Sequence, residues 1–535
     1  MISPIAFLNP ENLIWISLAL PVLAVALVFL FGKLPNVREA CTITVSVVLF
    51  GVICLLASHV FSGDRPIWEL GEIYTPLDVE SVTQTDALNK TTETLTAKKM
   101  SPFTIGFKVE PLGMLFALVA SGLWILTTIY AIGYMRGHHE INQTRFFACF
   151  AVAIFAALSA AFAKNLFTLF VAYEVMTIST YPLVTHHGNE EAKRGGRVYL
   201  GILLGTSVAF FMLAIAWTWS VAGTLDFTPG GILSQASLDG KITDMQLAVL
   251  LGLFAFGIGK AALMPFHRWL PAAMVAPTPV SALLHAVAVV KVGVFSILKV
   301  VIYIFGLDLI RDTPLEVGSQ YMINDWLCYL AGASILLASI VAMTKDNLKA
   351  RLAYSTIGQL AYITLGAAIA TPASVIGGGM HIAMHAVGKI TLFFCAGAIY
   401  VGAHKKNISD MRGLGRAMPF TMGAFLVASL CIIGIPPGGG AWSKWFLAIG
   451  AAGEGHTFLI AALMISSLLN IAYLVPIPIL GFLTPKGQEP MKYKEAPLMC
   501  VVPLCITAVG SVVLFFFADQ IYDWLLPITT ISGGN

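Results

Sequence analysis

Residues 258–293 read IGKAALMPFHRWLPAAMVAPTPVSALLHAVAVVKVG, and the architecture can be worked out from this stretch. Lys260, His285 and Lys291 stand among apolar residues, while Pro265 removes a backbone donor and interrupts a helix. Apolar runs near twenty residues are typical of membrane-spanning helices. A charged side chain near the bilayer centre costs at least about 2.5–3.5 kcal/mol. The stretch therefore predicts a broken membrane helix and a following helix that carry ionisable groups for a functional reason.

The rest of the chain has the same character. Of its 535 residues, 58% are hydrophobic and only 11% are charged, too few for the polar coat of a soluble protein. The predicted fold is all-α, a single polytopic membrane domain over residues 1–535. The expected spans, about fourteen, are 13–32, 41–61, 112–134, 145–163, 165–184, 197–222, 246–270, 278–306, 320–343, 350–371, 374–401, 418–450, 456–483 and 497–526.

The loops between these spans differ in charge. Lys and Arg are concentrated in the odd-numbered loops and are rare in the short even-numbered ones. Because basic loops stay on the cytoplasmic side, we expect the odd loops to be cytoplasmic and both termini extracytoplasmic. The one long loop, 62–111, is polar and Thr-rich, and it predicts an extracytoplasmic, partly flexible excursion without chemistry.

Six ionisable residues lie inside apolar spans: Glu174, Lys260, Lys291, Lys299, Lys389 and Lys444. Burial disfavours the charged form of both carboxyl and amino groups, so such residues can exchange protons near neutral pH. The alternatives are a fixed ion pair for any one of them, or snorkelling to the membrane surface, which we expect for Lys299 at the end of its span.

Histidines add to this pattern. His381, His385 and Lys389 follow one another at four-residue intervals, so they share one helix face and could relay protons. His285 is a similar candidate. The alternative is that these imidazoles only satisfy polar partners between packed helices, and for His267, just beyond Pro265, we expect such a structural role.

Two lysines lie beside helix breakers. Lys260 precedes Pro265, and Lys444 follows Pro436 and Pro437 and a run of glycines. A break survives in a membrane only inside protein or along a water-filled cavity, and such breaks recur near transporter ion sites. The interval between them equals five spans, which predicts two inverted five-helix repeats, 145–306 and 320–483. The glycine run could also be only a packing device.

Other kinds of chemistry lack a signal. The eight cysteines include no CxxC pair, and neither a phosphate-binding glycine loop nor HExxH occurs. We expect no cofactor, no metal site and, since the basic residues form no patch, no nucleic-acid partner. The expected role is that of a transporter subunit rather than an enzyme.

At these residues the chain resembles the proton-conducting antiporter-like subunits of respiratory complex I, membrane-bound hydrogenases and Mrp-type cation/proton antiporters. The resemblance runs from about Phe107 to Lys486, with 265–293 as its most specific segment. It implies fourteen helices, two inverted five-helix repeats, and a place in a multisubunit complex of a prokaryotic cytoplasmic (inner) membrane.

The resemblance also assigns residues. Glu174 falls at the family's fifth-helix glutamate, although Tyr173 stands where Trp is common. Lys260, Lys291 and Lys444 match ionisable residues of the seventh, eighth and twelfth helices, and HAVGK, ending at Lys389, matches the HAxxK pattern of the eleventh. The chain looks most similar to the D subunit of Mrp antiporters. It departs from the family in its long 62–111 loop and in reading GGGAW before Ser443.

The implied mechanism is stepwise proton transfer. Glu174 would pair with Lys260, which would pass protons through water, His285 and Lys291, and then by way of Lys389 and His385 toward Lys444. The cation exchanged for H⁺ would be Na⁺, and the partners would be sister membrane subunits and the lipid bilayer. The alternatives are a subunit of a redox-driven complex I or hydrogenase relative, a proton-coupled transporter of inorganic carbon or another substrate, and a purely structural scaffold.

Overall fold

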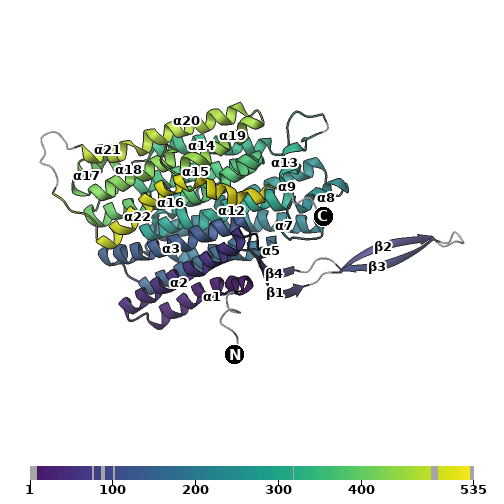
Figure 1. The fold of residues 1–535 in the computed structure, drawn as a ribbon, viewed down its shortest axis with the longest axis horizontal. Coiled ribbons are helices and arrows are strands. Elements are labelled where there is room, and N and C mark those ends of the chain that lie inside the picture. The colour runs from purple at the N-terminus through teal and green to yellow at the C-terminus, as the bar shows by residue number, and fades with distance from the viewer. Residues whose placement is uncertain are drawn as a thin grey trace.

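The structure, a computed structural model, describes residues 9–74, 77–85, 91–99, 103–316, 318–483 and 492–530. These form a bundle of roughly parallel and antiparallel helices (Figure 1). Within the described residues, twelve helices are long and apolar enough to cross a membrane, and two shorter apolar helices span Asp244–Gly257 and Pro419–Ile433. The two short helices fall where the sequence predicts broken spans, so the all-α membrane fold is confirmed.

The elements follow one another without a soluble domain. Up to residue 312, the helices are α1 (Pro10–Leu30), α2 (Pro35–Phe61), α3 (Pro111–Gly137), α4 (Gln143–Ala161), α5 (Leu166–Val184), α6 (Glu190–Thr206), α7 (Met212–Ala222), α8 (Ile232–Leu238), α9 (Asp244–Gly257), α10 (Trp269–Ala272), α11 (Thr278–Ala282), α12 (Val289–Val300) and α13 (Leu307–Asp312). The later helices are α14 (Asp325–Thr344), α15 (Leu348–Ile369), α16 (Pro372–Ala403), α17 (Leu414–Ala417), α18 (Pro419–Ile433), α19 (Gly440–Gly453), α20 (Thr457–Leu474), α21 (Pro476–Phe482), α22 (Leu498–Phe516) and α23 (Ala518–Leu525).

Both broken helices stop before a proline. α9 ends at Gly257, and a turn through Lys260 leads to Pro265 before α10 begins. α18 ends at Ile433, and the Pro436–Pro437 segment leads into α19. Proline cannot donate to a helical hydrogen bond, so each break leaves backbone groups to be satisfied by other partners. At the first break the indole Nε1 of Trp269 donates to the Gly259 carbonyl at 3.0 Å.

The helix after the first break is itself irregular. It runs over Thr278–Phe305, is fully buried, and contains a π-helical turn at Leu283–Val287. A π-turn widens the helix by one residue and frequently occurs at functional sites. Here it carries His285, so the irregular backbone coincides with one of the candidate residues.

The segment expected as a polar, flexible loop folds into strands. β1 (Ile67–Tyr74) pairs antiparallel with β4 (Phe103–Lys108), and β2 (Leu77–Thr85) pairs antiparallel with β3 (Thr91–Lys99). In Figure 1 the β2–β3 hairpin projects from the end of the bundle where α8 and α13 lie. Alternating Thr and Val residues favour paired strands, which a reading based on polarity alone overlooked.

The long helix α16 lies in the middle of the bundle (Figure 1). It packs against α3, α15, α18, α19 and α22, and nearly all its residues are buried. Its start is fixed by a capping box between Thr371 and Ser374, with Pro372 at the first helical position. A central helix of this kind can bring its polar face to both halves of the chain.

Close packing joins α12 to the first break. A Cβ added to Gly293 would lie 2.3 Å from the backbone of Lys260 and Ala261. Gly293→Ala should therefore lower the stability of the purified protein by about 1–3 kcal/mol, because the backbone has to shift. Gly201→Ala is the matched control, since nothing lies within 4 Å of that position. Thermal unfolding of both variants in detergent measures the difference, and equal unfolding temperatures would contradict the close packing.

Candidate functional site

Lys260 is fully buried at the first break. Its Nζ donates to the Tyr173 carbonyl at 2.9 Å and to Thr177 Oγ1 at 2.5 Å, and it lies 3.1 Å from the centroid of the Tyr173 ring. The Tyr173 hydroxyl in turn accepts from the Lys260 backbone N–H at 3.0 Å. The ammonium is thus held by oxygens and an aromatic face of α5, an arrangement that also suits a neutral amine.

Glu174 does not pair with Lys260, contrary to the sequence-based expectation. Both of its carboxylate oxygens are buried, and neither has a hydrogen-bond partner among the described residues. The reason is geometric: Tyr173 and Thr177, one helical turn apart on α5, face Lys260 and occupy its donors. Glu174 therefore lies near the lysine as a charge and not as a hydrogen-bonded partner.

The two halves of the chain meet at Lys291 and His385. Lys291 Nζ, on α12, lies 2.6 Å from Nδ1 of His385, on α16, and both side chains are buried. The His385 ring stacks on that of His381 at a centroid distance of 5.7 Å. His381 is bonded on both sides, to Ser443 Oγ at 2.8 Å and Gln359 Oε1 at 3.1 Å. This row leads from α12 across α16 to α19.

His285 lies deeper and is less well bonded. It is fully buried beside the Phe393 ring, and neither ring nitrogen finds a hydrogen-bond partner within the described part of the chain. Buried polar groups without partners are costly and mark functional positions or water sites. The structure thus places His285 inside the bundle but outside the hydrogen-bonded row.

Lys389 belongs to a second row. Its Nζ donates to Ser355 Oγ at 2.8 Å, and Ser355 accepts from the Tyr473 hydroxyl at 2.9 Å. Tyr473 also contacts Asn470 Oδ1 at 2.5 Å. The expected order of transfer, with Lys389 before His385, is therefore not the order of contacts, because Lys389 points to α15 and α20.

Lys444 lies at the second break, where helix α18 ends. Its Nζ donates to the carbonyls of Ile432 and Ile433, each at 2.9 Å, and lies 4.6 Å from the Tyr362 ring centroid. Carbonyls at a helix C-terminus lack intrahelical donors, so the break itself supplies the acceptors. Lys260 and Lys444 thus share a mode of binding, by free backbone oxygens and a tyrosine face.

Lys299 does not snorkel. It is 1% exposed, forms an ion pair with Glu110 at 2.9 Å, and donates to the Ala163 carbonyl at 2.7 Å. Its Nζ also lies 4.2 Å from the Phe227 ring centroid. Glu110 directly precedes α3 and was not among the residues singled out from the sequence, since it lies outside the apolar spans.

The arrangement offers proton carriers and no evident metal site. Within the described residues, no three His, Cys, Asp or Glu side chains are grouped to hold a metal ion. Amines, imidazoles and hydroxyls that alternate along a row can donate and accept in turn. The chemistry that this row supports is the movement of a proton.

Comparison with known families decides the relationship. The model of the NADH:quinone oxidoreductase/Mrp antiporter transmembrane region matches residues 163–470, and that of the N-terminus of complex I chain 5 matches residues 98–147. The chain belongs to this family. Its candidate residues from Glu174 to Lys444 all lie within the first match, so the antiporter-like relationship covers both breaks and both rows.

Relatives within the family include redox and antiporter proteins. NADH-quinone oxidoreductase subunit N of Desulforudis audaxviator is 30% identical over 450 residues, covering 80% of this chain and 86% of the relative. The fold also matches a chain of the Mrp complex from Dietzia sp. DQ12-45-1b, with a TM-score of 0.75, 20% identity, and coverage of 96% and 97%. A chain of an archaeal membrane-bound sulfane sulfur reductase gives a TM-score of 0.78, 21% identity, and coverage of 97% and 98%. At these identities the two solved structures speak for the fold alone.

Proposed function

We propose that this antiporter-like subunit translocates protons through its buried Lys and His residues within an Mrp-type Na⁺/H⁺ antiporter. The observation that carries the proposal is the 2.6 Å contact between Lys291 Nζ and His385 Nδ1. It joins the segment 145–306 to the segment 320–483, which we propose are inverted repeats. A proton held at that contact belongs to either half.

The contact constrains protonation. An ammonium of Lys291 can donate to His385 Nδ1 only when that nitrogen carries no proton. Both groups charged at 2.6 Å would repel strongly in an apolar interior. The pair therefore holds one proton at a time, and its transfer to His385 allows onward movement along the His381–Ser443 side toward Lys444.

The breaks at Lys260 and Lys444 serve as the two ends of this path. At each break the lysine is held by backbone carbonyls, which accept from an ammonium and release a neutral amine. Glu174, as an unpaired negative charge on α5, would raise the proton affinity of Lys260 without binding it. Lys389, with Ser355 and Tyr473, would form a side branch of the path.

A redox-driven complex is the second candidate, favoured by the likeness to NADH-quinone oxidoreductase subunit N. In both cases other membrane subunits are the partners, and under the predicted orientation the odd-numbered loops face the cytoplasm. A transporter of another substrate would need a pocket shaped for that substrate, whereas the residues above suit only protons.

A sodium pulse separates the two candidates. Vesicles that contain the purified complex and an internal pH dye receive Na⁺ without any electron donor. The antiporter predicts immediate H⁺ movement that an equal K⁺ or choline addition does not cause. Movement only after a donor and an acceptor of electrons are added would refute the antiporter and support the redox-driven alternative.

A further inference from the structure

A cavity of about 440 Å³ lies at one end of the bundle. It is enclosed by the end of α3, the turn after α5, the starts of α11 and α15, and the end of α16; its lining includes Tyr134, His138, Glu140, His187, Thr278 and Lys349. These loops are odd-numbered, so the cavity faces the cytoplasm under the predicted orientation. None of the residues assigned above to the proton path lines it.

A carboxylate at the cavity is surrounded by imidazoles. The Glu140 side chain is 6% exposed, and its oxygens lie 3.6 Å from His187 Nδ1, 3.7 Å from His186 Nε2 and 4.0 Å from His138 Nε2. Neither ring nitrogen of buried His186 makes a hydrogen bond within the described residues. Separations of this size exceed a direct hydrogen bond and suit proton exchange through a single water.

The surrounding charges bring these groups closer in proton affinity. Burial raises the pKa of Glu140, and the Lys349 ammonium partly offsets this rise. Burial lowers the pKa of His186 to about 4, helped by His187 and Arg145. Burial also lowers the pKa of His187, as do Lys349, His138 and Lys406, whereas Glu191 opposes the change. A carboxyl whose pKa rises and imidazoles whose pKa falls can pass a proton between them at small cost.

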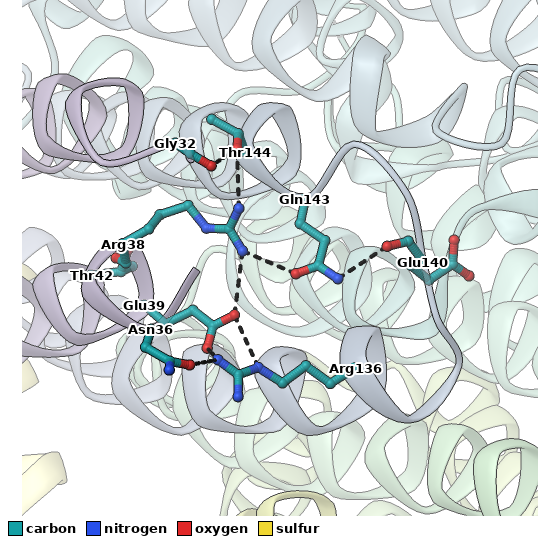
Figure 2. A network of polar contacts seen from close by, with 9 residues as sticks. All are labelled: Gly32, Asn36, Arg38, Glu39, Thr42, Arg136, Glu140, Gln143 and Thr144. Carbon is teal, nitrogen blue, oxygen red and sulfur yellow. Dashed lines mark hydrogen bonds and ion pairs between the residues drawn. The ribbon is translucent and has the colours of Figure 1, made fainter. Parts of the chain in front are cut away.

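The loop that carries Glu140 is clamped from behind (Figure 2). Gln143 donates to the Glu140 carbonyl at 3.0 Å and accepts from Arg38 Nη2 at 3.0 Å. Arg38 is buried and also bonds Glu39, which pairs with Arg136 of α3. In Figure 2 the Glu140 carboxylate points away from this network. The network therefore fixes the loop and leaves the carboxylate free to face the cavity.

The cavity floor leads inward. Thr278 Oγ1 donates to the Tyr134 hydroxyl at 3.5 Å, and both residues line the cavity. Thr278 is the first residue of α11, whose helix continues through His285 to Lys291. At a rise of about 1.5 Å per residue, His285 lies about 10 Å further along the helix. The cavity thus ends at the beginning of the helix that carries the buried groups.

We infer that Glu140, with His186 and His187, forms a proton-collecting site that loads the His285–Lys291 part of the path from this cavity. The inference rests on the proposed function and names the groups that supply its protons. A carboxylate at the mouth of a cavity raises the local concentration of protons, and neighbouring imidazoles pass them on. Such a site matters most when protons are scarce.

The test measures initial H⁺ uptake during turnover in vesicles whose cavity side faces outward. Glu140→Gln should slow uptake about tenfold at about pH 8.5 and less than about twofold at about pH 6.5, since direct uptake suffices in acid. Glu140→Asp should regain most of the alkaline rate, because it keeps an ionisable group. Glu190→Gln is the matched control: Glu190 is 82% exposed, pairs with Lys193, and does not line the cavity.

Each outcome decides between the two levels of the account. If Glu140→Gln keeps the wild-type rate at both pH values while Lys291→Ala stops uptake, the collecting site is wrong and the proposed function stands. If Lys291→Ala keeps uptake, the proposed function itself fails. If Glu190→Gln slows uptake as much as Glu140→Gln, or Glu140→Asp regains nothing, the effect is one of general surface charge or folding, and the inference is overturned. The amount of assembled complex is measured for every variant.

Discussion

Lys291→Ala reduces proton translocation at least about 10²-fold, the usual loss when a positioned proton carrier is removed. The lysine is buried and bonded to His385, so no neighbouring water surface replaces it. The expected flux, measured as H⁺ movement in vesicles that contain the whole complex, falls to the level of protein-free vesicles. Lys241→Ala is the matched control, because Lys241 is 59% exposed and pairs with Asp239.

A second substitution separates proton transfer from a fixed charge. Lys291→Arg keeps the positive charge and a donor to His385, but a guanidinium does not release its proton in a protein. It should therefore block flux nearly as well as alanine. Adding His385→Ala to Lys291→Ala should cost nothing more, since both groups act in one series. Full flux with arginine would show that Lys291 serves as a static charge.

Glu110→Ala should destabilise the protein by about 3–5 kcal/mol, because it leaves the buried ammonium of Lys299 without its partner. Lys299 is 1% exposed and cannot reach the membrane surface without rearrangement of its helix. The Ala163 carbonyl and the Phe227 ring remain, but neither carries a neutralising charge. The loss is measured by thermal or denaturant unfolding of the purified protein.

A double variant completes this test. Lys299→Met removes the charge, so Glu110→Ala combined with Lys299→Met should recover most of the stability that Glu110→Ala alone loses. Glu69→Ala is the control, since Glu69 forms an exposed pair with Lys164 that contributes about 0–1 kcal/mol. If Glu110→Ala costs no more than Glu69→Ala, the pair is not buried in the way described here.

The architecture was predictable because its signals are long. Apolar runs locate the spans and prolines locate both breaks, and these patterns depend on the solvent of the protein more than on its tertiary contacts. The lysines were recognisable for the same reason: Lys260, Lys291 and Lys389 are conspicuous in apolar sequence, and all three are buried. The strands over 67–108 were missed because a polar segment gives only a weak signal for pairing.

The partners of the lysines were not predictable from spacing within one helix. Ser355 and Gln359 lie one turn apart on α15 and bond Lys389 and His381 of α16. This ladder joins two helices, and its register depends on how they pack. Likewise, the expected Glu174–Lys260 pair failed because proximity in a motif does not fix which side chain faces a break. Glu110 was missed since it lies at a helix start, where a charge causes no surprise.

The most direct test of the central claim follows the proton on His385 itself. Nitrogen-15 labelling of histidine in the whole complex, with His385→Gln to assign the signal, allows solid-state NMR to report the protonation of its ring. Under a proton gradient the signal should change between the neutral and doubly protonated forms, and Lys291→Ala should abolish the change. A His385 ring that keeps one protonation state during turnover would contradict the account.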